Sequence, residues 1–456
     1  MSSSTPARTP IAKVVGASLV GTTVEWYDFF LYGVAASLVF GQVFFPEGDE
    51  LTGTLLSFAT FAVGFVARPV GGVVFGHFGD RLGRKKLLVL SLLMMGVATF
   101  AIGLLPTYAQ VGAVAPVLLT VLRLVQGFAL GGEWGGAVLI VSEHGDKSRR
   151  GFWASWPQAG APGGQLLANG VLALLAAFQS PEAFLSWGWR IPFLLSAVLV
   201  FVGLYVRLQV EESPVFAEAQ RRAEQRAALT GEKESLPILQ VLRRYPREVL
   251  TAMGARFAEN VSYYIFTIVI MTYLVTRYET PKSFVLNAVL IGAVVHFATI
   301  PMWGALSDRI GRRPVYLLGA AGVAVWGFVF FALIDTQSFP LTVLAVVVGL
   351  LFHGAMYGPQ SAFFSELFGT KVRYSGVSVG YQLSSILAGG LAPIIATALL
   401  ARYGSGLAIA VYLAACGALS LVAVGSYHET RHRELDADHA LDASPTGVTA
   451  GSTTPA

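Results

Sequence analysis

The chain has 456 residues, 54% of them hydrophobic and 13% charged, with a mean hydropathy of +0.63, and this composition excludes an ordinary soluble protein. The formal net charge of +4 does not indicate a nucleic-acid partner, because the basic residues gather in short loops between apolar segments. The single cysteine, Cys416, excludes a disulfide within the chain and stands in an apolar run, which indicates a packing role.

Apolar runs of about 20 residues, long enough to cross a bilayer as helices, occur twelve times along the chain. Their approximate ranges are 14–40, 52–76, 87–106, 113–141, 152–177, 189–208, 250–275, 284–306, 315–335, 339–362, 376–400 and 405–426. The first run holds acidic residues and lacks a cleavage site of small residues, which is typical of a retained helix and not of a signal peptide. The sequence therefore predicts an all-α membrane protein with twelve transmembrane helices.

The first run places two carboxyl groups at membrane depth. Glu25 and Asp28 are three residues apart, so they share a helix face, and Tyr32 lies one turn further along it. An ionised carboxylate in hydrocarbon costs roughly 2.5 to 3.5 kcal/mol, so the pair should face a wet cavity, contact a cation or hold a proton. A purely structural ion pair with Arg68 is the alternative.

Two arginines in the second and fourth runs are candidate binding groups for an anion. Arg68 precedes Pro69, which frees backbone groups and can bend the helix, and Gln126 lies on the helix face of Arg123. A guanidinium cannot lose its charge, so each arginine needs a carboxylate partner or an anionic substrate. Glu133 could point into the same cavity or pair with Arg123. A stripe of glycines at four-residue spacing predicts close helix contact: Gly127, Gly131 and Gly135.

The second half of the chain offers mostly uncharged polar groups at membrane depth. Arg256 and Glu259, one turn apart in the seventh run, either neutralise each other or contact the substrate. His296 and His353 have no second ligand at a suitable spacing, so neither a metal nor a cofactor is expected. Side chains that can either bind a small polar ligand or join helices are Asn260, Tyr263, Tyr264, Tyr357, Gln360, Tyr381 and Gln382.

The loops between these runs orient the predicted bundle. Basic residues fall in alternate loops, as Arg81, Arg84, Lys85, Lys86, Lys147, Arg149, Arg150, Arg309, Arg312, Arg313, Lys371 and Arg373. Cytoplasmic loops are enriched in Lys and Arg, so these loops and both termini are predicted to be cytoplasmic, with the protein in the plasma (inner) membrane. Residues 210–248 form a charged linker, and the composition of 428–456 predicts a disordered tail.

Two matched pairs of segments indicate a tandem duplication. Residues 76–86 (GHFGDRLGRKK) are repeated as 304–313 (GALSDRIGRR), each directly after a long apolar run. The segment from Ser142 to Gly151 is similarly matched by the one from Ser365 to Gly376. Such repeats are typical of secondary transporters, whose substrate path lies between two halves. The predicted units are a terminus (1–13), two pseudo-symmetric six-helix halves (14–209 and 249–427), the linker between them (210–248) and the tail (428–456).

The repeated loops resemble motif A of the major facilitator superfamily, and residues 123–127 (RLVQG) resemble its fourth-helix motif B. More specific segments are 25–29 (EWYDF), 65–71 (FVARPVG), 131–136 (GGEWGG), 187–193 (WGWRIPF) and 212–216 (ESPVF). Together they resemble the metabolite:proton symporter family, whose members carry shikimate, 2-oxoglutarate, citrate, and proline or betaine. The similarity spans about 11–433 and implies a monomeric, proton-coupled transporter in the lipid bilayer, but the shared motifs do not identify the cargo.

The resemblance also implies that the motif A loops latch the outward-facing state. Glycines allow close approach, an aspartate can cap a neighbouring helix, and arginines can pair with acidic groups across the cytoplasmic gap. The residues concerned are Gly76, Gly79, Asp80, Arg81, Gly83 and Arg84 in the first copy, and Asp308, Arg309, Gly311 and Arg312 in the second. Ser307 stands where the first copy has Gly79, so the second copy is expected to be looser.

Other protein classes fit less of the chain. Residues 376–380 match the hydrolase pattern G-x-S-x-G, but they open an apolar helix with no preceding strand, so no enzyme is predicted. The phosphate loop that an ATP-driven pump needs is not present in the sequence. Residues 160–164 (GAPGG) faintly resemble an antiporter motif, and uniport or exchange without proton coupling stays open as an alternative.

The sequence thus predicts proton-coupled uptake of a small polar metabolite. An organic acid, such as a carboxylate or a shikimate-like compound, is favoured because fixed arginines attract anions, and a zwitterion such as proline or betaine is the alternative. The expected proton-coupling groups are Glu25, Asp28 and Glu133. The expected substrate-binding groups are Tyr32, Arg68, Arg123, Gln126, Glu259, Asn260, Tyr263, Tyr357, Gln360, Tyr381 and Gln382.

Overall fold

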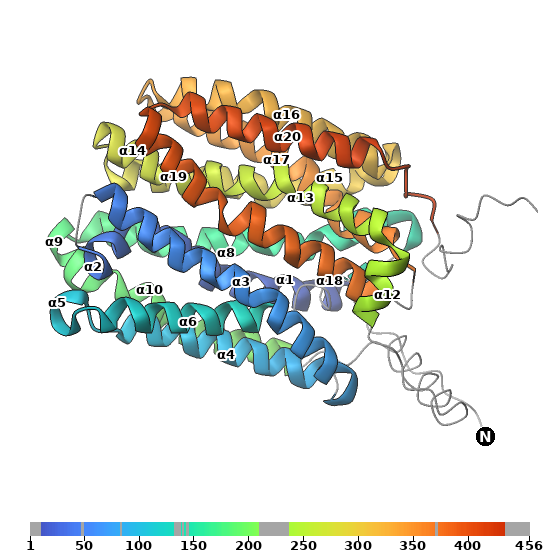
Figure 1. The fold of residues 1–456 in the computed structure, drawn as a ribbon, viewed down its shortest axis with the longest axis horizontal. Coiled ribbons are helices and arrows are strands. Elements are labelled where there is room, and N and C mark those ends of the chain that lie inside the picture. Colours follow the sequence, from blue (N-terminus) through green and yellow to red (C-terminus); the bar gives the residue numbers. More distant parts are fainter. Residues whose placement is uncertain are drawn as a thin grey trace, which may run out of the picture.

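The computed structural model describes residues 11–46, 50–82, 84–131, 138, 141–142, 146–208, 237–369 and 373–433. Within these ranges the chain forms helices and connecting turns, and no strand. The long helices make up the twelve spans of a bundle, which confirms the predicted all-α architecture (Figure 1).

The N-terminal half contributes the first six spans. In chain order they are α1 (Ile11–Ala35), continuing through the π-helical turn η1 (Ala36–Phe40) into α2 (Gly41–Phe44); α3 (Glu50–Leu82); α4 (Arg84–Leu104); α6 (Val114–Leu130); α8 (Arg150–Phe178); and α10 (Arg190–Leu208). Short segments between them are α5 (Tyr108–Val111), η2 (Lys147–Arg149), α9 (Pro181–Ala183) and η3 (Phe184–Gly188).

The C-terminal half repeats this plan after the short helix α12 (Pro237–Arg244). Its spans are α13 (Pro246–Tyr264), η4 (Ile265–Val269) and α14 (Ile270–Tyr278) as one; α15 (Lys282–Ile310); α16 (Arg312–Ile334); α17 (Phe339–Leu367); α18 (Arg373–Ser384), η5 (Ser385–Gly390) and α19 (Ala392–Tyr403) as one; and α20 (Gly406–Gly425). The π-helical turns η1 and η4 interrupt the first span of each half, as expected from a duplication. Such turns are frequent at functional sites.

Length and apolar composition alone mark most of these helices as membrane spans. Eight of the described helices pass this test, and α9–η3 with α10 adds a ninth despite a 47° bend. The apolar parts of α4 and α6 are shorter, and α8 is not among the spans that pass. The sequence of α8 includes two prolines and several polar residues, but α8 packs between other helices of the bundle, so these residues need not face lipid.

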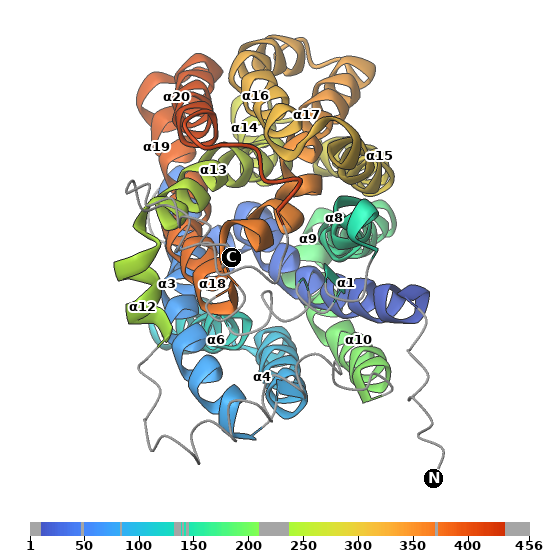
Figure 2. The same ribbon diagram turned by 90° about the vertical axis from the view of Figure 1, so that its right-hand side faces the viewer.

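The two halves lie next to each other in the view from the α18 side (Figure 2) and pack through several helices. α8 packs on α15 and α17 of the opposite half, and α3 packs on α18, η5 and α19. Within the N-terminal half α8 also packs on α1, where a methyl group on Gly164 would overlap the backbone at Tyr27. The glycines at 160–164, which resemble an antiporter motif, therefore have a packing role here.

The predicted glycine stripe brings α6 close to α3. A methyl group on Gly127 would overlap the Gly64 carbonyl, and one on Gly131 would overlap the Arg68 carbonyl. The third member, Gly135, lies outside the described residues. Close contact is confirmed at the two described positions. It fixes how far along the bundle axis Arg68 on α3 lies from Arg123 on α6.

One end of the bundle, which we call the α12 end, carries α12, the start of α18 and the end of α20, whereas α2, α5, α9 and α14 lie at the opposite, α14 end (Figure 1). Much of the predicted linker lies outside the described residues, but its last part forms α12 and the start of α13. Residues 428–433, assigned by the sequence to a disordered tail, instead pack on the bundle. The reason is capping: Glu429 accepts a hydrogen bond from the backbone N–H of Arg312 at the start of α16 (2.8 Å).

Candidate functional site

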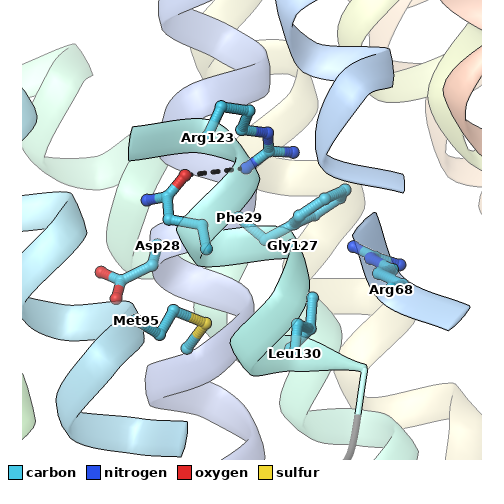
Figure 3. A pocket seen from close by; sticks show the side chains of 8 residues that line it. Asp28, Phe29, Arg68, Met95, Arg123, Gly127 and Leu130 are labelled. Atoms are coloured by element: carbon cyan, nitrogen blue, oxygen red, sulfur yellow. Dashed lines mark hydrogen bonds between the residues drawn. The ribbon is translucent and has the colours of Figure 1, made fainter. Parts of the chain in front are cut away.

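Side chains from α1, α3, α4 and α6 enclose a small cavity within the N-terminal half (Figure 3). Its lining residues are Asp28, Phe29, Arg68, Met95, Arg123, Gln126, Gly127 and Leu130. Two predicted arginines and one predicted carboxylate therefore meet in one place. The free space suits about one water molecule, so an organic acid would enter only after the surrounding helices move apart.

Arg123 is held on one side by polar contacts and on the other by aromatic rings. Its Nη1 donates to Gln126 Oε1 (3.0 Å), its Nε donates to the Phe61 carbonyl (3.4 Å), and the guanidinium lies 4.3 Å from the ring centre of Tyr32. Gly64 leaves room for the side chain, because a methyl group there would stand 2.6 Å from Arg123 Nε. Nη2 has no hydrogen-bond partner among the described residues, so it is free to donate to an oxygen of a ligand.

Arg68 lies mainly between aromatic faces. Its guanidinium is 4.2 Å from the ring centre of Phe65 and 4.6 Å from that of Phe29. Nε and Nη2 have no hydrogen-bond partner within the described part of the chain. Arg68 is also close enough to Arg256 of the other half for the two to repel. The unpartnered N–H groups of Arg68 therefore favour an anion at this place.

Asp28 is 1% exposed and faces this cavity from α1. Neither carboxylate oxygen has a well-formed hydrogen bond among the described residues, and a nearby polar side chain is that of Thr99. Figure 3 shows Asp28 and Arg68 on opposite sides of Phe29, so Asp28 does not pair with Arg68 in this structure. The alternative of a structural ion pair between this carboxylate pair and Arg68 otherwise stays open. Glu25 is buried and close enough to Asp28 to repel it, whereas Glu133 lies outside the described residues.

In the C-terminal half, Arg256 and Glu259 form a buried ion pair, with 3.2 Å between Nη1 and Oε2. Gln360 joins both, accepting from Arg256 Nη1 (3.2 Å) and donating to Glu259 Oε2 (3.1 Å). Arg256 also donates to Ser385 Oγ (3.3 Å) and stacks 3.5 Å from the ring centre of Tyr381. Of the two sequence alternatives, mutual neutralisation is the one observed in this state.

Two histidines noted in the sequence, but not connected there to each other or to Glu259, extend this network. His353 Nε2 is 3.4 Å from Glu259 Oε1, and His353 Nδ1 is 2.9 Å from His296 Nε2. Each histidine stands roughly 14 residues, about 21 Å, into a helix that begins at the α14 end. The two helices run in the same direction, so equal depth allows the contact, but a single sequence does not show that these two spans are neighbours.

Several other predicted polar side chains hold the two halves together. The links are Tyr263 Oη to Gln165 Oε1 (2.7 Å), Gln158 Nε2 to the Tyr357 carbonyl (3.5 Å) and Gln382 Nε2 to the Gly131 carbonyl (3.0 Å). Tyr32 shares a hydrogen bond with Thr60 within the N-terminal half (2.6 Å). Asn260 Nδ2 and Tyr357 Oη have no hydrogen-bond partner among the described residues. The amide N–H groups of Asn260 and the hydroxyl of Tyr357 are therefore available to bind a ligand.

At the α12 end, the second motif copy closes the gap between the halves. Asp308 accepts hydrogen bonds from the backbone N–H groups of Gly151 (2.8 Å) and Phe152 (2.9 Å) at the start of α8. Carboxylates at helix N-termini are stabilised both by these N–H groups and by the helix dipole. Asp308 thus caps α8 in the way that the sequence predicts for Asp80, whose own side chain lies outside the described residues.

Charged side chains reinforce the cap. Arg312 pairs with Asp308 (2.7 Å) and with Glu366 (3.2 Å), and Arg150 pairs with Glu366 across the halves (3.0 Å). Ser307 accepts from Arg312 Nη1 (2.7 Å), so its hydroxyl is part of the cluster. Whether this copy is looser than the first stays a prediction, because the side chains of the first copy lie outside the described residues. Gly311 has a φ of 109°, a conformation that favours glycine. The Arg309 carbonyl accepts from Arg431.

The first motif copy cannot be described in the same detail. Gly83 lies outside the described residues, and Gly76, Gly79, Asp80, Arg81 and Arg84 belong to helices whose side chains there are likewise outside them. At the α14 end, Lys282 Nζ donates to the Leu38 carbonyl (2.8 Å), and a methyl group on Gly33 would meet Ile268 at 2.5 Å. The described parts of the two halves therefore touch near both ends of the bundle. Among the described residues no group of three His, Cys, Asp or Glu could hold a metal.

Comparison with known proteins gives consistent matches over nearly the whole chain. The family model described as "Sugar (and other) transporter" matches residues 13–440. The inner membrane metabolite transport protein YhjE of Escherichia coli (strain K12) is 42% identical over 428 residues, covering 93% of this chain and 95% of that protein. The shikimate transporter of the same organism is 43% identical over 400 residues, covering 87% and 90%. A crystal structure of a D-xylose-proton symporter, 18% identical, covers 93% of this chain and 99% of its own with a TM-score of 0.72, which shows a common fold.

Proposed function

The chain belongs to the sugar (and other) transporter family of the major facilitator superfamily, and from this premise we propose that it carries a small carboxylated metabolite into the cell together with protons. Family membership makes it a secondary transporter of metabolites in a membrane, and not an enzyme. The carboxylated cargo, the direction and the proton coupling are our proposal.

The observation that carries the proposal is the pair of incompletely satisfied guanidinium groups near the interface of the halves. Arg68 and Arg123 each retain N–H groups without an acceptor among the described residues. A buried charge without a partner is costly, and a carboxylate fits a planar guanidinium with two parallel hydrogen bonds. The similarity to a shikimate transporter supports the same class of cargo, since shikimate is a carboxylate.

Asp28 is the proposed coupling group in this cavity. Coupling needs a group whose proton affinity differs between the open and the enclosed cavity. A carboxylate that alternates between water and the enclosed surroundings seen here meets that need. Glu25, which repels Asp28, and Glu133 stay as further candidates.

Contacts at both ends of the bundle support alternating access by rocking of the halves. Breaking the Asp308 cap on α8 would open the α12 end, and separating α14 from η1 would open the other. We propose that the α12 end, with its basic residues, faces the cytoplasm of a cell whose inner membrane holds the protein as a monomer. A reporter fused after residue 433 tests this orientation, and activity confined to the outer side would contradict it.

Uptake into proteoliposomes tests the proposed function. Labelled shikimate, 2-oxoglutarate, citrate, proline and betaine would be offered with and without an acidic exterior. We expect accumulation of a carboxylate above its external concentration only when the exterior is acidic. Accumulation of proline or betaine instead would make a zwitterion the cargo, and equilibration that ignores the pH gradient would make the protein a uniporter or exchanger.

A further inference from the structure

Three titratable side chains of the C-terminal half form one buried chain that the proposed function does not use. They are Glu259 on α13, His353 on α17 and His296 on α15, and they are 4%, 1% and 0% exposed. The Glu259 Oε1 to His353 Nε2 distance is 3.4 Å, and the His353 Nδ1 to His296 Nε2 distance is 2.9 Å. The chain therefore runs without a break from the Arg256 ion pair to α15.

The ionised end of the chain fixes the tautomers of the neutral histidines. A carboxylate only accepts hydrogen bonds, so His353 donates from Nε2 and keeps a lone pair on Nδ1. His296 then donates from Nε2 to that lone pair. Its own Nδ1 becomes an acceptor, and this atom has no hydrogen-bond partner among the described residues. His296 Nδ1, at one end of this row of side chains, can thus take up a proton, and the Glu259 carboxylate at the other end can receive one.

We propose that this chain carries a second proton in the transport cycle, distinct from the proton on Asp28; the inference rests on the proposed symport. A proton binds His296 Nδ1, and the Nε2–H bond of His296 breaks as its proton passes to His353 Nδ1. The Nε2–H bond of His353 breaks in turn, and that proton passes to Glu259 Oε1. The net change is one proton on the carboxylate and both imidazoles neutral in the opposite tautomer.

The product of this relay has a direct consequence for anion binding. Protonation of Glu259 removes the negative charge that lies 3.2 Å from Arg256. Ser385 and the ring of Tyr381 still hold the guanidinium in place. Arg256 then needs a new negative partner, and a substrate carboxylate between the halves supplies it, so proton uptake and substrate binding favour each other.

The surroundings of the chain allow this relay. The charged and titratable groups that interact with it from the packed helices are Arg256, Tyr263 and Tyr264 on α13, Tyr316 on α16, Tyr357 on α17 and Tyr381 on α18, with Arg68 of α3 acting on Arg256. Among these described groups Glu259 is the sole carboxylate. His296 lies on α15, which packs on α8 across the interface, so separation of the halves would admit water to its side of the chain.

A second proton changes what drives uptake. One proton moving with a monoanion carries no net charge, and each proton adds about tenfold to the limiting accumulation per pH unit. Two protons raise that limit to about 100-fold and make uptake respond to an inside-negative potential. The number of protons is therefore measurable from the driving force.

The transport test uses His353→Gln, His296→Gln and the exposed His432→Gln as a matched control, all in proteoliposomes with labelled shikimate. In wild type and His432→Gln we expect uptake driven by both the pH gradient and the potential. In the two buried variants we expect shikimate counterflow that persists but no longer strengthens at acidic pH, a response to the pH gradient alone, and a limiting accumulation about tenfold lower at one pH unit. Glutamine at 353 retains a donor toward Glu259 but cannot relay a proton.

Two results would overturn the relay. One is a response to the potential in both buried variants that equals wild type, and the other is a wild type that moves a single proton. If wild-type shikimate uptake does not respond to the pH gradient at all, the proposed function fails before the relay is tested.

A second measurement on wild type, which needs no substrate, is nitrogen-15 NMR of its histidines between about pH 5 and 9. The signals are assigned by comparison with the variants. Imidazoles of 296 and 353 that keep one tautomer throughout would overturn the proposal even if the variants do not fold.

Discussion

The two halves treat their buried arginines in opposite ways. In the N-terminal half, Arg123 and Arg68 lie against aromatic rings and keep N–H groups without acceptors in the described part of the chain. In the C-terminal half, Arg256 has Glu259 at 3.2 Å and Gln360 and Ser385 within hydrogen-bond distance. Halves that arose from one repeat have thus become electrostatically unlike.

This difference assigns different requirements to the two halves. Cation–π contacts of about 0.5 to 2 kcal/mol only partly offset the cost of burying a guanidinium, so the N-terminal cavity needs an anion from outside. The C-terminal arginine is already neutralised and becomes available only when its carboxylate is protonated. A substrate and a proton would then act on the two sides of one interface.

The largest expected effect follows from removing the N-terminal cation. Arg123→Ala should weaken shikimate binding by at least about 30-fold, because loss of one partner in a buried charge-assisted contact costs about 2 kcal/mol or more. Arg123→Lys should restore little of it, since an ammonium lacks the planar pair of donors. Isothermal titration of purified protein measures both, and Arg68→Ala is expected to behave in the same way.

Arg402→Ala, which removes an exposed arginine at the end of α19, is the matched control and should bind as wild type does. Folding would be compared by thermal melting. Unchanged affinity in folded Arg123→Ala and Arg68→Ala would remove these arginines from the site and erase the contrast between the halves.

The second largest effect concerns the unpartnered carboxylate of the same cavity. Asp28→Asn should abolish accumulation driven by a pH gradient while retaining substrate counterflow, because an amide keeps the shape but cannot exchange a proton. Glu25→Gln should show the same loss if the two carboxylates act together, and a smaller one if Glu25 only repels Asp28. Full accumulation with normal pH dependence in both variants would move the coupling group elsewhere.

The sequence was sufficient for the architecture and for part of the site. Apolar runs predict the spans because lipid demands them, and the spacing of Glu25 and Asp28 predicts one buried face. The sequence predicts a span over 152–177, but it does not show that this helix, α8, lies between α1, α15 and α17. The neighbours of a helix, and not its hydropathy, decide whether its polar residues face lipid. Long-range partners are invisible for the same reason: the His353–His296 contact joins residues 57 apart, and a single sequence carries no distance between helices.

A moderate effect is expected from making the C-terminal half resemble the N-terminal one. Glu259→Gln retains hydrogen-bonding groups toward Gln360 and His353 but removes the charge beside Arg256. Wild-type affinity for shikimate should rise from about pH 8 to about pH 5, because a substrate carboxylate that takes Arg256 leaves Glu259 without its cation and lets it bind a proton. The variant should change by less than about twofold over that range, a difference of under about 0.4 kcal/mol.

Titration of shikimate into both proteins at the two pH values measures this contrast. Arg256→Gln with Glu259→Gln is the informative companion, because it removes the competing pair and should also lose the pH dependence, with weaker binding. A Glu259→Gln protein that folds and keeps the wild-type pH dependence would show that this ion pair stays closed during transport.

The smallest expected effect is steric and tests how closely Arg123 must be held. A methyl group on Gly64 would stand 2.6 Å from Arg123 Nε and 3.1 Å from its Cδ, so Gly64→Ala should push the guanidinium away from Gln126. Because the end of an arginine side chain can shift, we expect about tenfold weaker shikimate binding and not its loss. Gly170→Ala on α8 is the matched control, since nothing lies within 4 Å of its added methyl group, and alanine should leave affinity unchanged while raising helix stability by up to about 1 kcal/mol. If Gly64→Ala binds shikimate as tightly as Gly170→Ala does, the observed placement of Arg123 is not the one that the substrate needs, and the N-terminal cavity would have to rearrange on opening.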